Sequence, residues 1–223
     1  MLSSIQDIQH AFYINLDHRT DRKTHIEEQL YLAGINAQRF NAVKLDNGAI
    51  GCSMSHLKIL QQAIKEGWPH VAIIEDDTLF LDPDLFVTQL NQFLKTHDTW
   101  DVVLMAGNNV PPFERIDNTC VRVSHCQTTT AYIVNGHYME TLANNIKEGI
   151  QKLMREPEKH IIYAIDKYWL QLQKRGFWFL ITPLTVVQRE DYSDIEKRVT
   201  NYNSLMTDLE KRHFKPNILR RVI

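Results

Sequence analysis

The stretch VAIIEDD at residues 71–77 decides the fold, because an apolar run as long as a buried strand ends there in three consecutive acids. Burying carboxylates without a partner or a cation costs several kcal/mol each. We therefore expect the acids at the carboxyl end of the strand, the edge where open α/β sheets bind ligands. Oxygen ligands there suit a divalent cation of the Mg²⁺ or Mn²⁺ kind. A strand that runs into a solvated turn is the alternative interpretation.

Outward from this stretch, predicted strands and helices alternate. Apolar runs predict strands at 11–16, 37–43, 101–107, 120–125, 130–134 and 177–181. Helical periodicity predicts helices at 20–33, from about 53, at 83–94, 136–146 and 161–174, with a loop over 108–118. This alternation with short connections predicts an α/β fold in which helices cover both faces of a mostly parallel central sheet.

Bulk composition narrows the class of protein. The chain has 223 residues, of which 43% are hydrophobic and 23% charged, so it can bury a sizeable core and is not disordered. A net charge of −2 gives no general attraction to nucleic acid. Three cysteines fit neither a disulfide framework nor a zinc motif. Neither a signal peptide nor an apolar run of ~20 residues is present, which predicts a cytoplasmic location.

The C-terminal segment has its own character. We predict one domain over residues 1–223, in which 188–223 form an extension or an acceptor-side tail. Basic and apolar residues mix at its end: Lys211, Arg212, His213, Phe214, Lys215, Ile218, Leu219, Arg220 and Arg221. Such a mixture could lie on an anionic lipid surface, giving peripheral membrane contact. A solvated basic tail is the alternative.

Two junctions between a strand and a helix carry candidate binding residues. Arg19 and Arg22 stand at the start of the helix predicted from residue 20, where backbone N–H groups and guanidinium groups form an anion site. Ser55 and His56 follow the glycines of the segment 48–51 early in the next helix. Neither a GxxxxGK[ST] nor a GxGxxG spacing occurs, so the classical NTPase and dinucleotide patterns are absent.

Several of these motifs occur in an order that resembles glycosyltransferase family 25. They are YINLD at 13–17 with Arg19 and Arg22, GC at 51–52 with Ser55 and His56, IEDD at 74–77, TAYIV at 130–134, Asp166 with Tyr168 and Trp169, and the looser match from Pro183 through Gln188 to Ile195. Together they cover about 180 residues. The family includes bacterial lipooligosaccharide galactosyltransferases and animal collagen galactosyltransferases.

The resemblance implies a GT-A fold, which is a Rossmann-like three-layer αβα arrangement, and an inverting transfer of a hexose from a UDP-sugar, commonly UDP-galactose. It implies that Glu75 and Asp77 hold a divalent metal, Mn²⁺ first and Mg²⁺ second, with Gln188 as a candidate third ligand. Position 75 departs from the family's DxD-like pattern, which makes Asp77 the first choice for direct contact. The donor-binding residues would be Asn15, Arg19, Arg22, Ser55, His56 and Asp76.

Inversion in one step needs a base for the acceptor hydroxyl. Asp166 is the candidate, because neighbouring apolar and aromatic residues could desolvate its carboxylate and raise its pKa. An exposed carboxylate paired with Lys167 or Arg155 is the alternative, and Asp194 and Glu190 are reserves.

The expected partners are a UDP-sugar and a glycan, either lipooligosaccharide-like or collagen-like. Two other classes stay open. An Asp-dependent phosphatase also places acids after an apolar strand, but its nucleophile would fall at position 75, which is Glu. A catalytically inactive GT-A-like sugar- or nucleotide-binding module would keep the fold without turnover.

Overall fold

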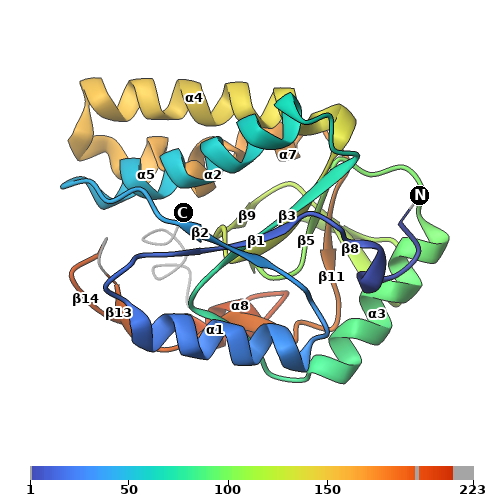
Figure 1. The fold of residues 1–223 in the computed structure, drawn as a ribbon. Helices are drawn as coiled ribbons and strands as arrows, with labels where there is room; N and C mark the ends of the chain where they lie inside the picture. The colour runs from blue at the N-terminus through green and yellow to red at the C-terminus, as the bar shows by residue number, and fades with distance from the viewer. Residues whose placement is uncertain (1, 194–195, 213–223) are drawn as a thin grey trace.

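The computed structural model describes residues 2–193 and 196–212. An eight-stranded sheet forms its middle layer (Figure 1). The strands of this sheet are Ala11–Asn15 (β1), Gln38–Asn41 (β2), His70–Glu75 (β3), Val102–Leu104 (β5), Phe113–Arg115 (β7), Cys120–Val123 (β8), Ala131–Asn135 (β10) and Trp178–Ile181 (β11).

The strand order is β2-β1-β3-β10-β5-β11-β8-β7. The pairs β1–β2, β1–β3 and β5–β11 are parallel, whereas β10 is antiparallel to both of its neighbours, β3 and β5. Strand β8 likewise runs against β11 and β7. Six of the eight strands therefore point the same way, which confirms the predicted mostly parallel sheet.

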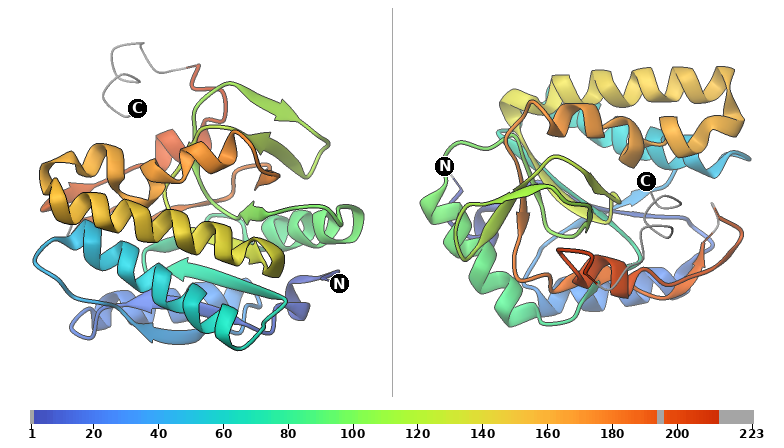
Figure 2. Two further views of the ribbon diagram at one scale, coloured as in Figure 1. Left: turned by 90° about the horizontal axis from the view of Figure 1, so that it is seen from above. Right: turned by 180° about the vertical axis from the view of Figure 1, so that it is seen from behind.

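Helices form the two outer layers (Figures 1 and 2). They are Thr20–Leu32 (α1), Gly48–Lys65 (α2), Pro83–Thr96 (α3), Met139–Arg155 (α4), His160–Tyr163 (α5), Ile165–Tyr168 (α6), Leu170–Gln173 (α7) and Asn203–Thr207 (α8). Helices α2, α4 and α5–α7 cover one face of the sheet, and α1, α3 and α8 lie on the other. Each face has its own core, with Leu60 and Ile146 buried on the first and Ile26 and Phe86 on the second. The predicted three-layer α/β architecture is confirmed.

Helix α2 begins five residues before the predicted start at residue 53. The sequence Asp46-Asn47-Gly48 suggested a free turn, but Asn47 is the N-cap, and its side chain accepts a hydrogen bond from Ile50 N at 3.2 Å. A short polar side chain there satisfies an amide that the first helical turn leaves unpaired. The correction moves Ser55 and His56 from the start of the helix to its third turn.

The single helix predicted over 161–174 was also wrong. The chain forms three short helices instead, because Ala164 adopts an extended backbone with φ −56° and ψ 150° that ends α5 and lets α6 begin at Ile165. By contrast, the helix predicted over 136–146 continues to Arg155, since Ile150 and Leu153 extend its buried stripe.

Small ladders were missed from the sequence. They pair Thr78–Phe80 (β4) with Val186–Gln188 (β12), Asn108–Asn109 (β6) with Cys126–Gln127 (β9), and Asp191–Ser193 (β13) with Arg198–Thr200 (β14). The segment 108–118, predicted as a loop, contains β6 and β7. Strands of two or three residues are too short to show a period of two.

The expectation of a basic C-terminal surface needs one correction. Lys211 is only 4% exposed, and its Nζ donates hydrogen bonds to the carbonyl oxygens of Leu205 and Asp208. It therefore cannot present its charge to a membrane. Arg212 is exposed and pairs with Glu210, whereas residues 213–223 of the predicted tail lie outside the described residues. Within the described part of the chain, helices with the length and apolarity needed to cross a bilayer are absent.

Candidate active site

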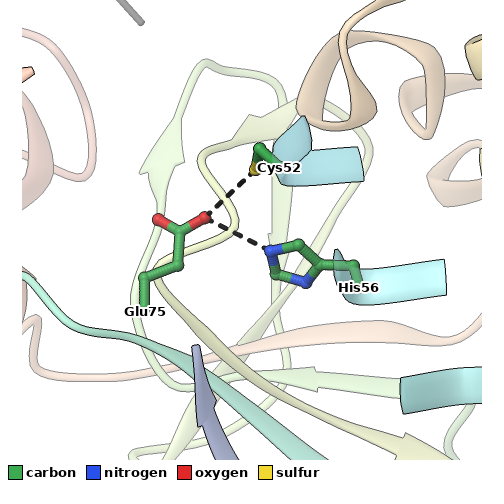
Figure 3. Close-up of side chains that lie close together, drawn as sticks. All are labelled: Cys52, His56 and Glu75. Atoms are coloured by element: carbon green, nitrogen blue, oxygen red, sulfur yellow. Dashed lines mark hydrogen bonds and ion pairs between the residues drawn. The ribbon is translucent and has the colours of Figure 1, made fainter. Parts of the chain in front are cut away.

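Glu75 is the last residue of β3, and its carboxylate contacts side chains from three other segments, of which Figure 3 shows Cys52 and His56 of α2. Its Oε1 accepts a hydrogen bond from Thr129 Oγ1 at 2.6 Å and lies 3.3 Å from His56 Nε2 and 3.7 Å from Cys52 Sγ. Its Oε2 lies 3.4 Å from Gln188 Nε2. The reversed direction of β10 explains the contact with Thr129, because the residues before β10 lie at the carboxyl end of β3.

Asp77 lies in the turn between β3 and β4, close to Glu75. Its Oδ2 is 3.3 Å from Arg22 Nη1. Its Oδ1 is buried and lacks a hydrogen-bond partner among the described residues. The pairing of β4 with β12 sets Gln188 opposite Thr78, which brings the Gln188 amide beside the two acids. A buried oxygen without a partner is costly, so this atom is suited to contact a bound ligand.

The two acids differ in their proton affinity. Burial raises the pKa of Asp77 to about 7, the neighbouring charge of Glu75 acts in the same direction, and Arg22 opposes both. Burial also acts to raise the pKa of Glu75, but hydrogen bonds from His56 and Thr129 outweigh it and hold that pKa below its usual value. Near neutral pH Glu75 is therefore ionised while Asp77 is partly protonated, and a cation between them would favour ionisation of both.

These residues fit a hard divalent metal. Glu75, Asp77 and Gln188 offer two carboxylates and one amide oxygen, the donor types that Mg²⁺ and Mn²⁺ prefer. The partnerless Oδ1 of Asp77 is the specific observation behind this fit. The structure thus contains residues able to hold a metal where the sequence predicted them, whereas their identity as ligands stays a prediction.

Asp76, predicted to bind the donor, is a buried link between strands. Its Oδ2 accepts a hydrogen bond from Asn15 Nδ2 at 2.7 Å, and its Oδ1 accepts one from Arg22 Nη1 at 2.9 Å. Asn15 is 1% exposed, and its Nδ2 also donates to the carbonyl oxygen of Arg19. Burial raises the pKa of Asp76. Asn15 and Asp76 therefore hold the ends of β1 and β3 together.

Arg19 and Arg22 form a guanidinium cluster with matched carboxylates. Asp191 Oδ2 lies 3.0 Å from Arg19 Nη2, 3.0 Å from Arg22 Nε and 2.9 Å from Arg189 Nη2. Arg19 also pairs with Asp21 at 2.9 Å. Both predicted arginines come together at the cavity edge, and their charges are already compensated by the protein.

Ser55 and His56 are buried side chains of α2 that lie beside the site. Ser55 Oγ donates to Gly51 O at 2.9 Å and accepts from Val43 N at 2.9 Å, which ties α2 to the segment after β2. His56 is fully buried, and its Nδ1 lies 2.8 Å from Tyr132 Oη. The polar atoms of both side chains are thus already hydrogen-bonded within the protein and offer little polar surface to a nucleotide.

Asp166, the candidate base, begins the first turn of α6 and lines the same cavity as Glu75 and Asp77. Its Oδ2 accepts a hydrogen bond from Thr128 N at 3.2 Å. Burial raises its pKa, although the adjacent Lys167 acts to lower it. The structure therefore brings Asp166 and the acid pair together, although their separation in sequence is large.

Two cavities meet at the acid pair. One, of about 420 Å³, lies beside Arg19, Arg22 and the segment 42–46. The other, of about 410 Å³, lies beside Asp166, α5 and the segments 127–129 and 196–202. Residues that line both cavities are Cys52, Glu75, Asp77, Gln188 and Ser193. This geometry is suited to hold two substrates on opposite sides of one set of carboxylates.

Sequence reasoning missed Thr129 and Asp191, and it gave no role to Cys52 and Tyr132, which it quoted only as parts of motifs. Cys52 and His56 are four residues apart on α2, a spacing that puts both on one helix face and was a readable signal. Thr129 and Tyr132 reach the site only because β10 is reversed. Asp191 meets the arginines through a contact across 172 residues of sequence, which has no local signature.

Comparison with known proteins shows the family to which the chain belongs. The family described as "Glycosyltransferase family 25 (LPS biosynthesis protein)" matches residues 44–169, more than half of the chain. The chain belongs to glycosyltransferase family 25, as its motifs predicted.

Individual relatives are distant. A protein of Rattus norvegicus called "Probable inactive glycosyltransferase 25 family member 3" is 25% identical over 129 residues, which are 56% of this chain and 21% of that protein. A "Glycosyltransferase 25 family member" of Anopheles gambiae is 23% identical over 196 residues, 72% of this chain and 31% of that protein. The chain thus spans about a fifth to a third of the curated relatives it matches.

Among solved structures, a glycosyltransferase involved in the glycosylation of the major capsid of PBCV-1 matches 78% of this chain and 82% of its own, with 12% identity and a TM-score of 0.47.

Proposed function

We propose that this chain is a metal-dependent, inverting hexosyltransferase that moves a sugar, with galactose as first choice, from UDP to a hydroxyl group of a glycan. The acceptor would be lipooligosaccharide-like or, as the second choice, a collagen-like hydroxylysine. The observation that carries the proposal is the meeting of two cavities at Glu75 and Asp77, with Asp166 in the second cavity. We assign the first cavity to the donor and the second to the acceptor, within one domain and in the cytoplasm.

On the donor side, the chain's own residues would place and hold a diphosphate. Arg19 and Arg22 stand at the cavity edge at the start of α1, where cations and backbone N–H groups favour anions. Their present carboxylate partner, Asp191, keeps both guanidinium groups oriented before the nucleotide binds. The positive side chains would then stabilise the charge that develops on the departing UDP.

A bound divalent cation would supply electrostatic stabilisation of the diphosphate leaving group. Glu75 and Asp77 would hold it, with Gln188 as third ligand. The ionised Glu75 and the partly protonated Asp77 fit this role, because a bound cation would take the place of the proton on Asp77.

On the acceptor side, Asp166 would take the proton of the attacking hydroxyl. The hydroxyl oxygen forms a bond to the anomeric carbon as the bond from that carbon to the phosphate oxygen breaks. The proton goes to the Asp166 carboxylate and the electron pair leaves with UDP. A pKa raised by burial suits this step, because it brings the affinity of the base for the proton closer to neutral pH.

An inactive binding module is the second candidate. It is favoured by the printed name of the rat relative, which calls that protein probably inactive. Against it, this chain keeps Glu75, Asp77, Asp166 and both arginines around connected cavities. A phosphatase loses its basis with membership of the glycosyltransferase family.

The test is UDP release from a panel of UDP-sugars, with Mn²⁺ or with EDTA. We expect slow, Mn²⁺-dependent hydrolysis of UDP-galactose that the Asp77→Ala variant loses. Asp84→Ala, which changes an exposed acid of α3, is the matched control. Release that is equal in Asp77→Ala and the parent chain would remove the metal assignment. Calorimetric binding of UDP without release from any donor would support the inactive module.

A further inference from the structure

A second group of potential metal ligands surrounds one oxygen of Glu75, whereas Gln188 faces the other oxygen. Cys52 Sγ, His56 Nε2 and Glu75 Oε1 all lie within 4.8 Å of one another (Figure 3). Cys52 and His56 come from successive turns of α2, and both side chains point at the same oxygen of the strand-end carboxylate. The opposite oxygen, Oε2, faces Gln188. The two oxygens of Glu75 thus serve two different sets of neighbours.

Two of the three ligand separations are close to those in a zinc coordination shell, and the third is below 4.8 Å. A tetrahedral Zn²⁺ with the usual bond lengths separates its N and O ligands by about 3.3 Å and its S and O ligands by about 3.5 Å. The observed separations are 3.3 Å from His56 Nε2 to Glu75 Oε1 and 3.7 Å from Cys52 Sγ to the same oxygen.

We propose that Cys52, His56 and Glu75 form a soft-cation site that binds Zn²⁺ and shares Glu75 with the proposed oxygen-ligand site of Glu75, Asp77 and Gln188. Thiolate and imidazole ligands select zinc over manganese and magnesium. One thiolate and one carboxylate also balance the charge of the ion. The proton of the Cys52 thiol and any proton on His56 Nε2 leave to solvent as the metal binds.

The surroundings of the three ligands support a built site. Tyr132 Oη lies 2.8 Å from His56 Nδ1 and can accept an Nδ1 proton, so that with metal bound Nε2 could act as a ligand once the proton it donates to Glu75 has left. Thr129 Oγ1 donates to Glu75 Oε1 at 2.6 Å and fixes the carboxylate. Cys52 lines both cavities, so the fourth position of a tetrahedral ion can open toward solvent or substrate.

Sharing of Glu75 gives the site a consequence for activity, and this consequence rests on the proposed function. A Zn²⁺ ion on Oε1 withdraws negative charge from the carboxylate and sets a second dication close to the Mn²⁺ position. Zinc is therefore expected to weaken Mn²⁺ binding and to inhibit sugar transfer.

The direct test uses Co²⁺ as an optical probe for zinc in the full chain. We expect one equivalent of Co²⁺ to produce a thiolate-to-cobalt charge-transfer band in the near ultraviolet, which one equivalent of Zn²⁺ removes. Cys52→Ser abolishes the band. Cys120→Ser is the matched control, because Cys120 belongs to the other metal-ligand group among the described residues, His97, Asp117 and Cys120. A band that persists in Cys52→Ser, or its absence from the parent chain, overturns the proposal.

Two further measurements separate this site from the proposed enzyme activity. Tyr132→Phe should lower Zn²⁺ affinity by about tenfold, since it removes only the partner of the His56 ring. Displacement of bound Mn²⁺ by Zn²⁺, followed by electron paramagnetic resonance, should occur in the parent chain and in Cys120→Ser but be weakened in Cys52→Ser. Cobalt binding at Cys52 without any sugar transfer would support the zinc site and contradict only the proposed function. Unaltered Zn²⁺ affinity in Tyr132→Phe would contradict the assigned His56 tautomer.

Discussion

At the scale of single residues, the local environments of the acids in the site give them different pKa values. Glu75 accepts hydrogen bonds that hold it ionised, whereas Asp77 and Asp166 have pKa values raised by burial. A raised pKa serves different ends in the two aspartates, because Asp77 faces a second carboxylate and Asp166 faces an open cavity. The first favours exchange of a proton for a cation, and the second favours acceptance of a proton from a substrate.

Replacing Asp166 should separate chemistry from binding. In Asp166→Asn the amide cannot take the acceptor proton, so turnover should fall by about 10²–10⁴-fold. Affinity for UDP should stay close to that of the parent chain, because Asp166 lines the cavity away from the arginines. Steady-state transfer kinetics and calorimetry of UDP binding measure the two effects. Glu158→Gln, at an exposed acid before α5, is the control, and unchanged turnover in Asp166→Asn would remove this residue as the base.

The raised pKa of Asp77 predicts how stability depends on pH without metal. Its pKa is 3.8 in the reference state and about 7 in the folded chain. Between these values the folded chain keeps a proton that the unfolded chain releases, so the Asp77 contribution is present at low pH and is lost as pH rises toward 7. The loss is at most about 1.4 kcal/mol per pH unit.

Urea unfolding in EDTA at several pH values between about 5 and 8 measures this effect. The free energy of unfolding of Asp77→Asn should increase relative to that of the parent chain as pH rises, since the amide does not titrate. Parallel pH profiles for the two proteins would show that Asp77 is not strained by burial and by Glu75.

At the scale of elements, the sequence predicted the helices and strands whose apolar spacing repeats several times. It failed where contacts with other elements determine the local structure. Strand β3 and helices α1 and α3 occur where the apolar spacing indicated. The broken segment α5–α7 was not predicted, because its residues retain helical periodicity while the backbone at Ala164 is extended. Placement of Asp166 depends on that break, so the residue was predicted but its setting was not.

Gly149 on α4 allows the close approach of α5 and α6. A Cβ atom there would lie 3.1 Å from Tyr163 O and 3.2 Å from Tyr168 Cδ1. Gly149→Ala should destabilise the fold by about 1–3 kcal/mol and displace α6. Because α6 carries Asp166, sugar transfer should fall more than donor hydrolysis.

Urea unfolding and the two activity assays measure these effects, with Asn144→Ala as the control on an exposed position of α4. If transfer and stability match those of the control, α6 does not depend on this contact.

At the scale of the whole molecule, the cavity beside Arg19 and Arg22 is bordered by residues that are far apart in the sequence. Helix α1 and strand β13 meet at Asp191, where two arginines of the N-terminal part and Arg189 converge on one carboxylate. Sequence could predict that Arg19 and Arg22 stand at a helix start. It could not predict their partner, because the contact follows from the return of the chain through β12 to the edge of the site.

Loss of the Asp191 charge should therefore destabilise the contact between α1 and β13 as a whole and not only one ion pair. In Asp191→Asn three guanidinium groups remain close together without their shared carboxylate, and Arg19 and Arg22 are largely buried, with side chains 13% and 12% exposed. We expect a loss of about 1–3 kcal/mol in the free energy of unfolding, below the cost for fully buried pairs. Protease cleavage within β13 and β14 should become faster, because the arginines no longer hold β13 against α1. Urea unfolding and limited proteolysis measure both effects, and Glu190→Gln, an exposed neighbouring acid, is the control.

High salt should narrow the difference between Asp191→Asn and the parent chain, since screening weakens both the lost attraction and the new repulsion. A difference that does not respond to salt would mean that packing, and not charge, holds α1 and β13 together.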